Sequence, residues 1–175
     1  MSLILSGDSP SFSGTYQGGV ITSGTAQATT SGTAIDFTSI PSWVKRITVM
    51  LQGVSTNGSS PLQIQIGSGS VQTTGYQSCV GYGPSAGQFT TSTAAFICES
   101  TASASPSNTL QGSMIISLLG SNTWCEQCGF YAPGNTIQQN GGGSVSLSGT
   151  LDRIRLTTQN GTDIFDAGSI NILYE

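Results

Sequence analysis

The chain has no histidine and very few charged residues, and each shortage excludes a class of function. Only 7% of its 175 residues are charged, and four Lys and Arg against eight Asp and Glu give a net charge of −4. Histidine is the side chain that normally titrates near neutral pH, so its absence excludes the usual Ser-His and Cys-His catalysis. Nucleic acid binding needs many cationic contacts to phosphate, which four scattered cations cannot supply. We therefore expect no nucleic acid partner and no histidine-based enzyme.

Long apolar runs are also missing. No stretch approaches the length that spans a bilayer. The start of the chain, Met1–Asp8, lacks the basic segment and the long apolar segment of a secretory signal peptide. We therefore expect synthesis in the cytoplasm without a signal peptide and no membrane insertion.

Cysteine is scarce, and its spacing gives a weak signal. Cys125 and Cys128 form a C-x-x-C pair, which occurs in redox sites and in half of a zinc site. A redox motif is expected to open a helix, whereas the surroundings here are typical of a strand. Zinc would need a second close pair, and Cys79 and Cys98 lie far apart in the sequence. We interpret the cysteines as ordinary thiols, with a disulfide or a metal site as alternatives, and predict no cofactor.

Serine, threonine and glycine are abundant and together supply 74 of the 175 residues. With 36% hydrophobic residues and a mean hydropathy of +0.05, the composition is typical of a folded domain. Helical periodicity is absent, while short Val, Ile, Thr and aromatic runs end at Gly, Asn or Pro. The sequence predicts an all-β fold, an antiparallel two-sheet β-sandwich of the jelly-roll type with about nine to eleven strands. Residues 1–18 are predicted to be a leader or attachment segment and residues 19–175 the domain.

The first clear turn signal is Asn57–Gly58. Asn-Gly favours the type I′ turn of a tight hairpin, because both central residues need positive φ. A hairpin centred there places Leu51 opposite Ile64, so that the apolar faces of the two strands coincide. We therefore predict that the strands on either side of this turn pair with each other.

The second turn signal is Asn160–Gly161, which predicts a C-terminal hairpin. A regular register would place Arg155 opposite Asp166. Ala167–Gly168 is predicted to be a β-bulge, since glycine inside a strand often marks one.

The middle of the chain has weaker signals. Residues 67–109 are rich in Gly, Ser, Thr and Pro and are predicted to be long loops, with one firm strand at Phe96–Cys98. Met114–Leu119 is the most apolar run and is predicted to be buried on both faces. Trp124–Tyr131 is predicted to be the next strand, and Gly141–Gly143 a loop.

Carboxylates are the remaining source of catalytic chemistry. Asp152, Asp163 and Asp166 lie close in the sequence to Arg153 and Arg155. A glycoside hydrolase would need a carboxylate pair, and calcium would need a regular ligand spacing that is absent. We interpret these residues as cross-strand ion pairs and predict no catalytic residue and no metal ligand.

Aromatic residues in polar segments are the better functional signal. Sugars bind to aromatic faces and short polar side chains, because a ring offers a flat apolar surface with little entropy to lose. The alternative for each is simple packing, which we expect for Trp43. The candidate carbohydrate-binding residues are Tyr76, Tyr82, Phe89, Trp124 and Tyr131.

Several segments resemble the receptor-binding tip of the tail fibre proteins of tailed bacteriophages and prophages. They are Ile40–Gly58, Ile64–Gly67, Thr74–Tyr76 and the chain end Phe165–Glu175. The resemblance implies a homotrimeric β-sandwich in the virion, made in the host cytoplasm and attached to other virion tail proteins. It also implies contact with a bacterial surface receptor, commonly polysaccharide, and supplies no agreed binding residues.

The predicted function is therefore host recognition by a non-enzymatic adhesin. The alternatives are a structural virion or trimerisation domain, a glycan-cleaving tailspike module, and a free-standing lectin.

Overall fold

The computed structural model describes residues 21–83 and 88–175, and these residues form strands, turns and bends without a helix. The predicted attachment segment, residues 1–18, lies outside the described residues. The strands of the described part are β1 (Thr22–Ser23), β2 (Gln27–Ala28), β3 (Ala34–Thr38), β4 (Arg46–Thr56), β5 (Leu62–Ser68), β6 (Ser70–Val71), β7 (Gln77–Gly83), β8 (Phe89–Ser92), β9 (Phe96–Ile97), β10 (Leu110–Gly120), β11 (Thr123–Ala132), β12 (Ile137–Ser146), β13 (Arg153–Thr158) and β14 (Phe165–Tyr174).

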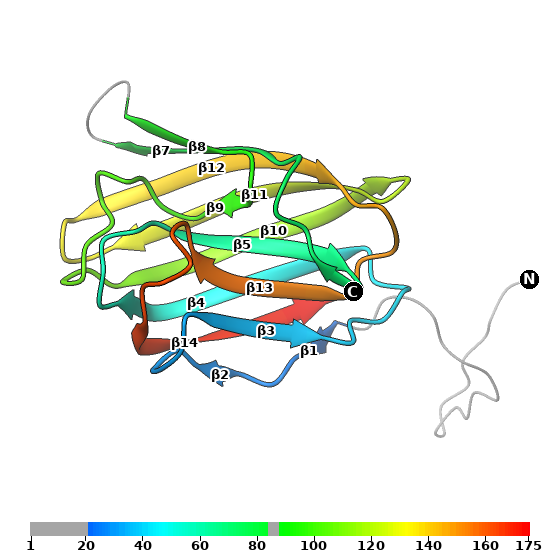
Figure 1. Ribbon diagram of the computed structural model, residues 1–175, viewed down its shortest axis with the longest axis horizontal. Helices are drawn as coiled ribbons and strands as arrows, with labels where there is room; N and C mark the ends of the chain where they lie inside the picture. Colours follow the sequence, from blue (N-terminus) through cyan, green and yellow to red (C-terminus); the bar gives the residue numbers. More distant parts are fainter. Residues whose placement is uncertain (1–20, 84–87) are drawn as a thin grey trace, which may run out of the picture.

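These strands form two antiparallel sheets, which confirms the predicted all-β class (Figure 1). The nine-stranded sheet has the order β1-β14-β4-β10-β11-β12-β7-β8, and β2 also pairs with β14. The five-stranded sheet has the order β3-β13-β5-β6, and β9 also pairs with β5. In Figure 1 the smaller sheet lies in front of the larger one.

One hydrophobic core lies between the sheets. Alternate residues of a strand point to opposite faces, so β4 and β11 bury every second side chain along most of their length, whereas β5 is buried at every position from Leu62 to Gly67. Ile47 and Val49 of β4, Ile64 of β5 and Ile154 of β13 are all fully buried in the same cluster. Because β4 belongs to the large sheet and β5 and β13 to the small one, the two inner faces pack together as in a sandwich.

The predicted first hairpin is wrong. β4 pairs with β10 and β14, whereas β5 pairs with β13, so Asn57–Gly58 carries the chain from one sheet to the other. Leu51 lies opposite Gly112 and Ile170 instead of Ile64. The inward faces were predicted correctly, but they meet across the core rather than side by side.

The predicted C-terminal hairpin is wrong for the same reason. Asn160–Gly161 connects β13 of the small sheet to β14 of the large sheet. Arg155 therefore pairs with Asp36 of β3, and Asp166 accepts a hydrogen bond from Ser55 instead. The predicted bulge is confirmed, because the register of β14 shifts on both sides of Ala167.

The segments predicted to be loops also contain strands. Residues 67–109 include β6, β7 and β8 besides the expected β9. Gly141–Gly143 lies inside β12, opposite β7. A Cβ on Gly141 or Gly143 would lie within 3 Å of β7 backbone atoms, so a run of glycines that resembles a loop lets these strands approach closely.

Two predictions of burial need correction. β10 lies between two strands, but its outward side chains are not covered, and Ile115 is 41% exposed. Trp43, expected in the core, is 38% exposed and packs against Tyr174, with 5.9 Å between the ring centroids. The predicted strand at Trp124–Tyr131 is present as β11.

Candidate functional site

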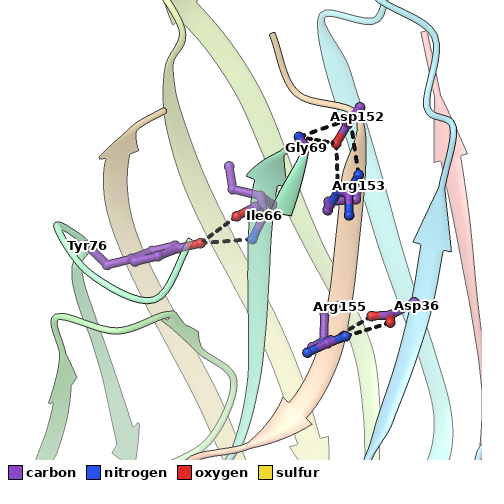
Figure 2. Close-up of polar contacts among 7 residues, drawn as sticks. All are labelled: Asp36, Ile66, Gly69, Tyr76, Asp152, Arg153 and Arg155. Atoms are coloured by element: carbon purple, nitrogen blue, oxygen red, sulfur yellow. Dashed lines mark hydrogen bonds and ion pairs between the residues drawn. The ribbon is translucent and has the colours of Figure 1, made fainter. Parts of the chain in front are cut away.

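Two of the five candidate aromatic residues lie in the core. Tyr76 is 1% exposed and Trp124 is 2% exposed. The Tyr76 hydroxyl accepts a hydrogen bond from the Ile66 amide at 2.8 Å and donates to the Ile66 carbonyl at 3.1 Å (Figure 2). Burial raises the pKa of Tyr76 well above its usual value. Both residues pack rather than face solvent, which corrects their prediction as sugar contacts.

Two others lie on the outer face of the large sheet. Phe89 of β8 is 68% exposed and Tyr131 of β11 is 40% exposed. A Cβ on Gly81 would lie 3.0 Å from the Phe89 ring, so this ring covers the outer side of β7. The fifth candidate, Tyr82, lies in β7 opposite Gln139, and its side chain is outside the described part.

Amide side chains and glycines lie between these two rings. Gln138 of β12 is directly opposite Tyr131, and Asn140 of β12 is opposite both Gly129 and Gly81. Gln138 and Asn140 are exposed, whereas Gln139 between them is fully buried, so both amides point outward. We call this surface the amide–aromatic face and define it as Phe89, Tyr131, Gln138 and Asn140 with the glycines between them.

The amides were missed from the sequence. Gln138–Asn140 reads as three consecutive polar residues with no alternation, because the inward Gln139 is polar as well. The burial of Gln139 depends on a partner that no sequence pattern reveals. Its side chain accepts a hydrogen bond from the Ser100 amide at 3.1 Å and donates to the Ser103 hydroxyl.

A buried carboxyl group lies on the inner side of the same sheet. Glu126 of β11 is 6% exposed and points toward the core, where Ser78 of β7 donates a hydrogen bond to Oε1 at 3.4 Å. The Ser78 hydroxyl accepts from the Ile97 amide at 3.1 Å, which connects the sheet to β9. Glu126 Oε2 has no hydrogen-bond partner among the residues that the structure describes, and desolvation raises the pKa of Glu126 to about 7.

The small sheet carries two ion pairs, both formed by arginines of β13. Arg155 of β13 forms two hydrogen bonds of 2.7 Å with the Asp36 carboxylate of β3 (Figure 2). Arg153 donates to Asp152 at 2.8 Å, and the Gly69 amide also donates to Asp152. These bonds, that of Arg153 foremost, lower the pKa of Asp152. The interpretation as a cross-strand ion pair is confirmed for Arg155, although its partner is Asp36. It is wrong for the others: Arg153 pairs with its sequence neighbour Asp152, and Asp163 and Asp166 form no ion pair within the described residues.

The four cysteines are all free thiols. Cys125 and Cys128 lie three positions apart on β11, so they point to opposite faces, Cys128 into the core. Burial raises the pKa of the Cys128 and Cys98 thiols. In residues 21–83 and 88–175 no group of three or more His, Cys, Asp or Glu is placed to hold a metal ion.

Two small hollows lie away from the amide–aromatic face. One, of about 10 Å³, includes Glu99 and Asn108 in its lining, and the other, of about 40 Å³, includes Leu173 and Tyr174. Both are too small for a sugar ring, so the exposed face is the better candidate for a ligand. The described residues contain no helix that is long and apolar enough to cross a membrane.

Comparison with known proteins adds no identification. No protein-family model, no curated protein and no solved structure matches the chain.

Proposed function

We propose that this protein is the receptor-binding tip of a phage tail fibre and binds a bacterial surface polysaccharide through the amide–aromatic face. The observation that carries the proposal is the pairing of two exposed rings, Phe89 and Tyr131, with two exposed amides, Gln138 and Asn140, on one sheet face. Rings offer apolar surfaces to the C–H faces of sugars, and amides both donate to and accept from hydroxyl groups. The resemblance of Ile40–Gly58 and of the chain end to fibre tips supports the biological setting.

We further infer that the sandwich is a jelly roll. If β1 and β2 count as the first strand, the sheets contain the orders β1-β14-β4-β10 and β3-β13-β5-β9. Successive strands of this set then alternate between the sheets at both ends of the chain, as expected for two interleaved Greek keys. In this arrangement β11, β12, β7 and β8 extend one sheet beyond the jelly roll and carry the amide–aromatic face.

The fibre-tip proposal includes a homotrimer bound to other virion tail proteins. Exposed apolar side chains on β10 support self-association, with Leu119 at 76% and Ile115 at 41% exposure. These residues lie on β10, the strand beside β11, where Ile115 is opposite Gln127 and Leu119 lies toward the end of the sheet that is distant from Tyr131.

Substitution of the two rings tests the binding proposal. Tyr131→Ala and Phe89→Ala are expected to weaken binding to an array of bacterial polysaccharides by about tenfold or more, because each removes a stacking surface. Thermal unfolding should change little, since both rings are exposed. Ile164→Ala is the matched control, because Ile164 is 47% exposed and lies in the turn before β14.

The outcome separates binding from a structural role. Equal binding by the wild type and both ring variants would contradict the proposed site. A protein that binds no polysaccharide but assembles with fibre proteins would instead be a structural virion domain.

A further inference from the structure

Among the described residues, no charged side chain points outward from the strands that carry the amide–aromatic face or from the adjoining β10. Within β10, β11, β12, β7 and β8 the single Asp, Glu, Lys or Arg is Glu126, and it points inward. Every outward position of these strands is an amide, a hydroxyl, a glycine, a thiol or an apolar group. A surface of this extent without a formal charge is selective, because it can satisfy hydroxyl groups but cannot neutralise an anion.

All four cations of the chain lie elsewhere. Arg153 and Arg155 belong to the small sheet and are bound by Asp152 and Asp36. Lys45 and Arg46 stand at the start of β4, where Arg46 pairs with Glu175.

Arg46 is the cation on the large sheet itself, and it lies far from the face. It is opposite Ser117, which is opposite Cys125 at the far end of β11 from Tyr131. The distance along that strand is about 20 Å, more than twice the screening length of about 8 Å at physiological salt. Arg46 therefore exerts little attraction on an anion bound at Tyr131.

The two rings are also well separated across the sheet. Tyr131 aligns with Gln138 and Gly83, while Phe89 of β8 aligns with Gly81 on the neighbouring β7. Three strand spacings and a two-residue offset place the rings about 16 Å apart. A disaccharide cannot span this distance, whereas a longer chain that crosses β12 and β7 passes over Asn140.

From this arrangement we propose that the ligand is an uncharged polysaccharide, bound along its chain and across the strands from β11 to β8. The inference rests on the proposed function and specifies its substrate class. The face offers no cation to a uronate, sialate or phosphate group, and the net charge of −4 repels polyanions. The hydroxyl groups of a neutral sugar form hydrogen bonds with the Gln138 and Asn140 amides. The Tyr131 and Phe89 rings pack against the two ends of the bound stretch of polysaccharide.

Affinity electrophoresis of the full chain in gels that contain defined polymers tests the proposal. The neutral probes are mannan, galactan and dextran, and the anionic probes are polygalacturonate and hyaluronan. We expect retardation by at least one neutral polymer and none by the anionic ones. The dissociation constant should change by less than about twofold from low to high salt, since no ion pair is screened. Tetrasaccharides or longer fragments of the bound polymer should compete, and its disaccharide should not.

Added cations provide a second variant set. The double variant Gln138→Lys with Asn140→Lys should gain binding to polygalacturonate and lose at least about tenfold in affinity for the neutral polymer. Gln159→Lys is the matched control, because Gln159 is an exposed amide in the turn after β13. The control should behave as the wild type does.

The outcomes distinguish the two proposals. If the wild type binds an anionic polymer and this binding is lost at high salt, the proposal of an uncharged ligand is wrong, while the receptor-binding function stands. Absence of retardation in all gels overturns both. Neutral binding that the ring variants retain overturns the location of the site.

Discussion

At the residue scale, the most informative side chain after the exposed rings is the buried Glu126. A carboxyl group removed from water and left with one weak hydrogen bond favours its neutral form. Glu99 is also buried, accepts a hydrogen bond from the Leu62 amide at 3.1 Å, and has a pKa raised by desolvation to about 7. The thiols of Cys98 and Cys128 lie near these acids and stay neutral in this range, because their own pKa values are raised.

These two acids predict that stability falls as pH rises toward neutrality. The folded pKa of about 7 lies above the ordinary 4.5, so between these values the folded state holds a proton that the unfolded state has lost. The stabilisation is complete below pH 4.5 and is lost as pH rises to about 7, on the order of 3 kcal/mol for each group. Urea unfolding from pH 4.5 to 8 measures this slope.

Variants identify the source of the slope. Glu126→Gln should remove about half of it and leave the other half to Glu99. Glu99→Gln should have the matching effect. A slope that neither variant changes would show that other groups control the pH dependence.

The thiols make a second prediction at this scale. Cys79 and Cys125 are partly exposed, whereas Cys98 and Cys128 are buried. An aromatic disulfide reagent should therefore label two thiols quickly in the native protein and the other two only on unfolding. Cys125→Ser should remove one fast thiol, and Cys128→Ser none. Fast labelling of Cys128 would contradict the opposite orientations of the C-x-x-C pair.

At the element scale, the two Asn-Gly turns explain which parts of the fold are predictable. The chain turns at both places, and the buried faces of the strands beside them were predicted correctly, because the face follows from local alternation. The type I′ geometry was wrong, because Asn57, Gly58 and Asn160 do not have positive φ. The pairing partners were wrong, because any strand with alternating apolar residues presents the same pattern to a neighbour in its sheet and to a sheet across the core. Only contacts distant in sequence decide between them.

Here the deciding contacts join the two turns to each other. The Ile164 amide donates to Asn57 Oδ1 at 2.8 Å, and the Ser60 amide donates to Asp163 Oδ2 at 2.9 Å. The Asn57 amide also donates to the Ile164 carbonyl at 2.9 Å. Two segments that each resemble a hairpin turn thus form one corner between the sheets. The same limit applies to the candidate site. The aromatic residues could be selected from the sequence, but the amides could be recognised as part of a surface only once the strand order was known.

The bulge in β14 gives a prediction for a single glycine. Gly168 has φ +95°, and a Cβ there would lie 2.4 Å from the Gly53 carbonyl oxygen. Gly168→Ala should destabilise the fold by about 2 kcal/mol or more, because backbone rather than a flexible side chain must move. Gly161→Ala is the control: φ is +69° but no atom lies within 4 Å of the added Cβ, so about 1 kcal/mol is expected. Equal losses in thermal or urea unfolding would contradict a steric role for the bulge.

At the scale of the whole molecule, the large sheet divides its outer face between two kinds of surface. The amide–aromatic face on β11, β12, β7 and β8 suits hydrated sugar, because its polar groups keep both donors and acceptors. The adjoining β10 exposes the apolar side chains of Ile115 and Leu119. Covering them with another protein surface would remove apolar area from water, which is favourable. The function proposed above requires both surfaces, one for the receptor and one for further copies of the chain.

This division predicts that assembly and binding can be separated by mutation. Light scattering on a sizing column should give three times the chain mass of 17.9 kDa for the wild type. The double variant Ile115→Glu with Leu119→Glu should give a monomer, since like charges would be buried at each interface. The control Ile164→Glu, at another exposed apolar position, should remain a trimer.

The monomeric variant should keep the intrinsic affinity of the amide–aromatic face for a short oligosaccharide but lose avidity for the polymer, because three linked sites raise the effective concentration. A wild-type monomer at micromolar concentration would contradict self-association through β10, and a monomeric variant with undiminished polymer binding would show that one copy suffices for the receptor.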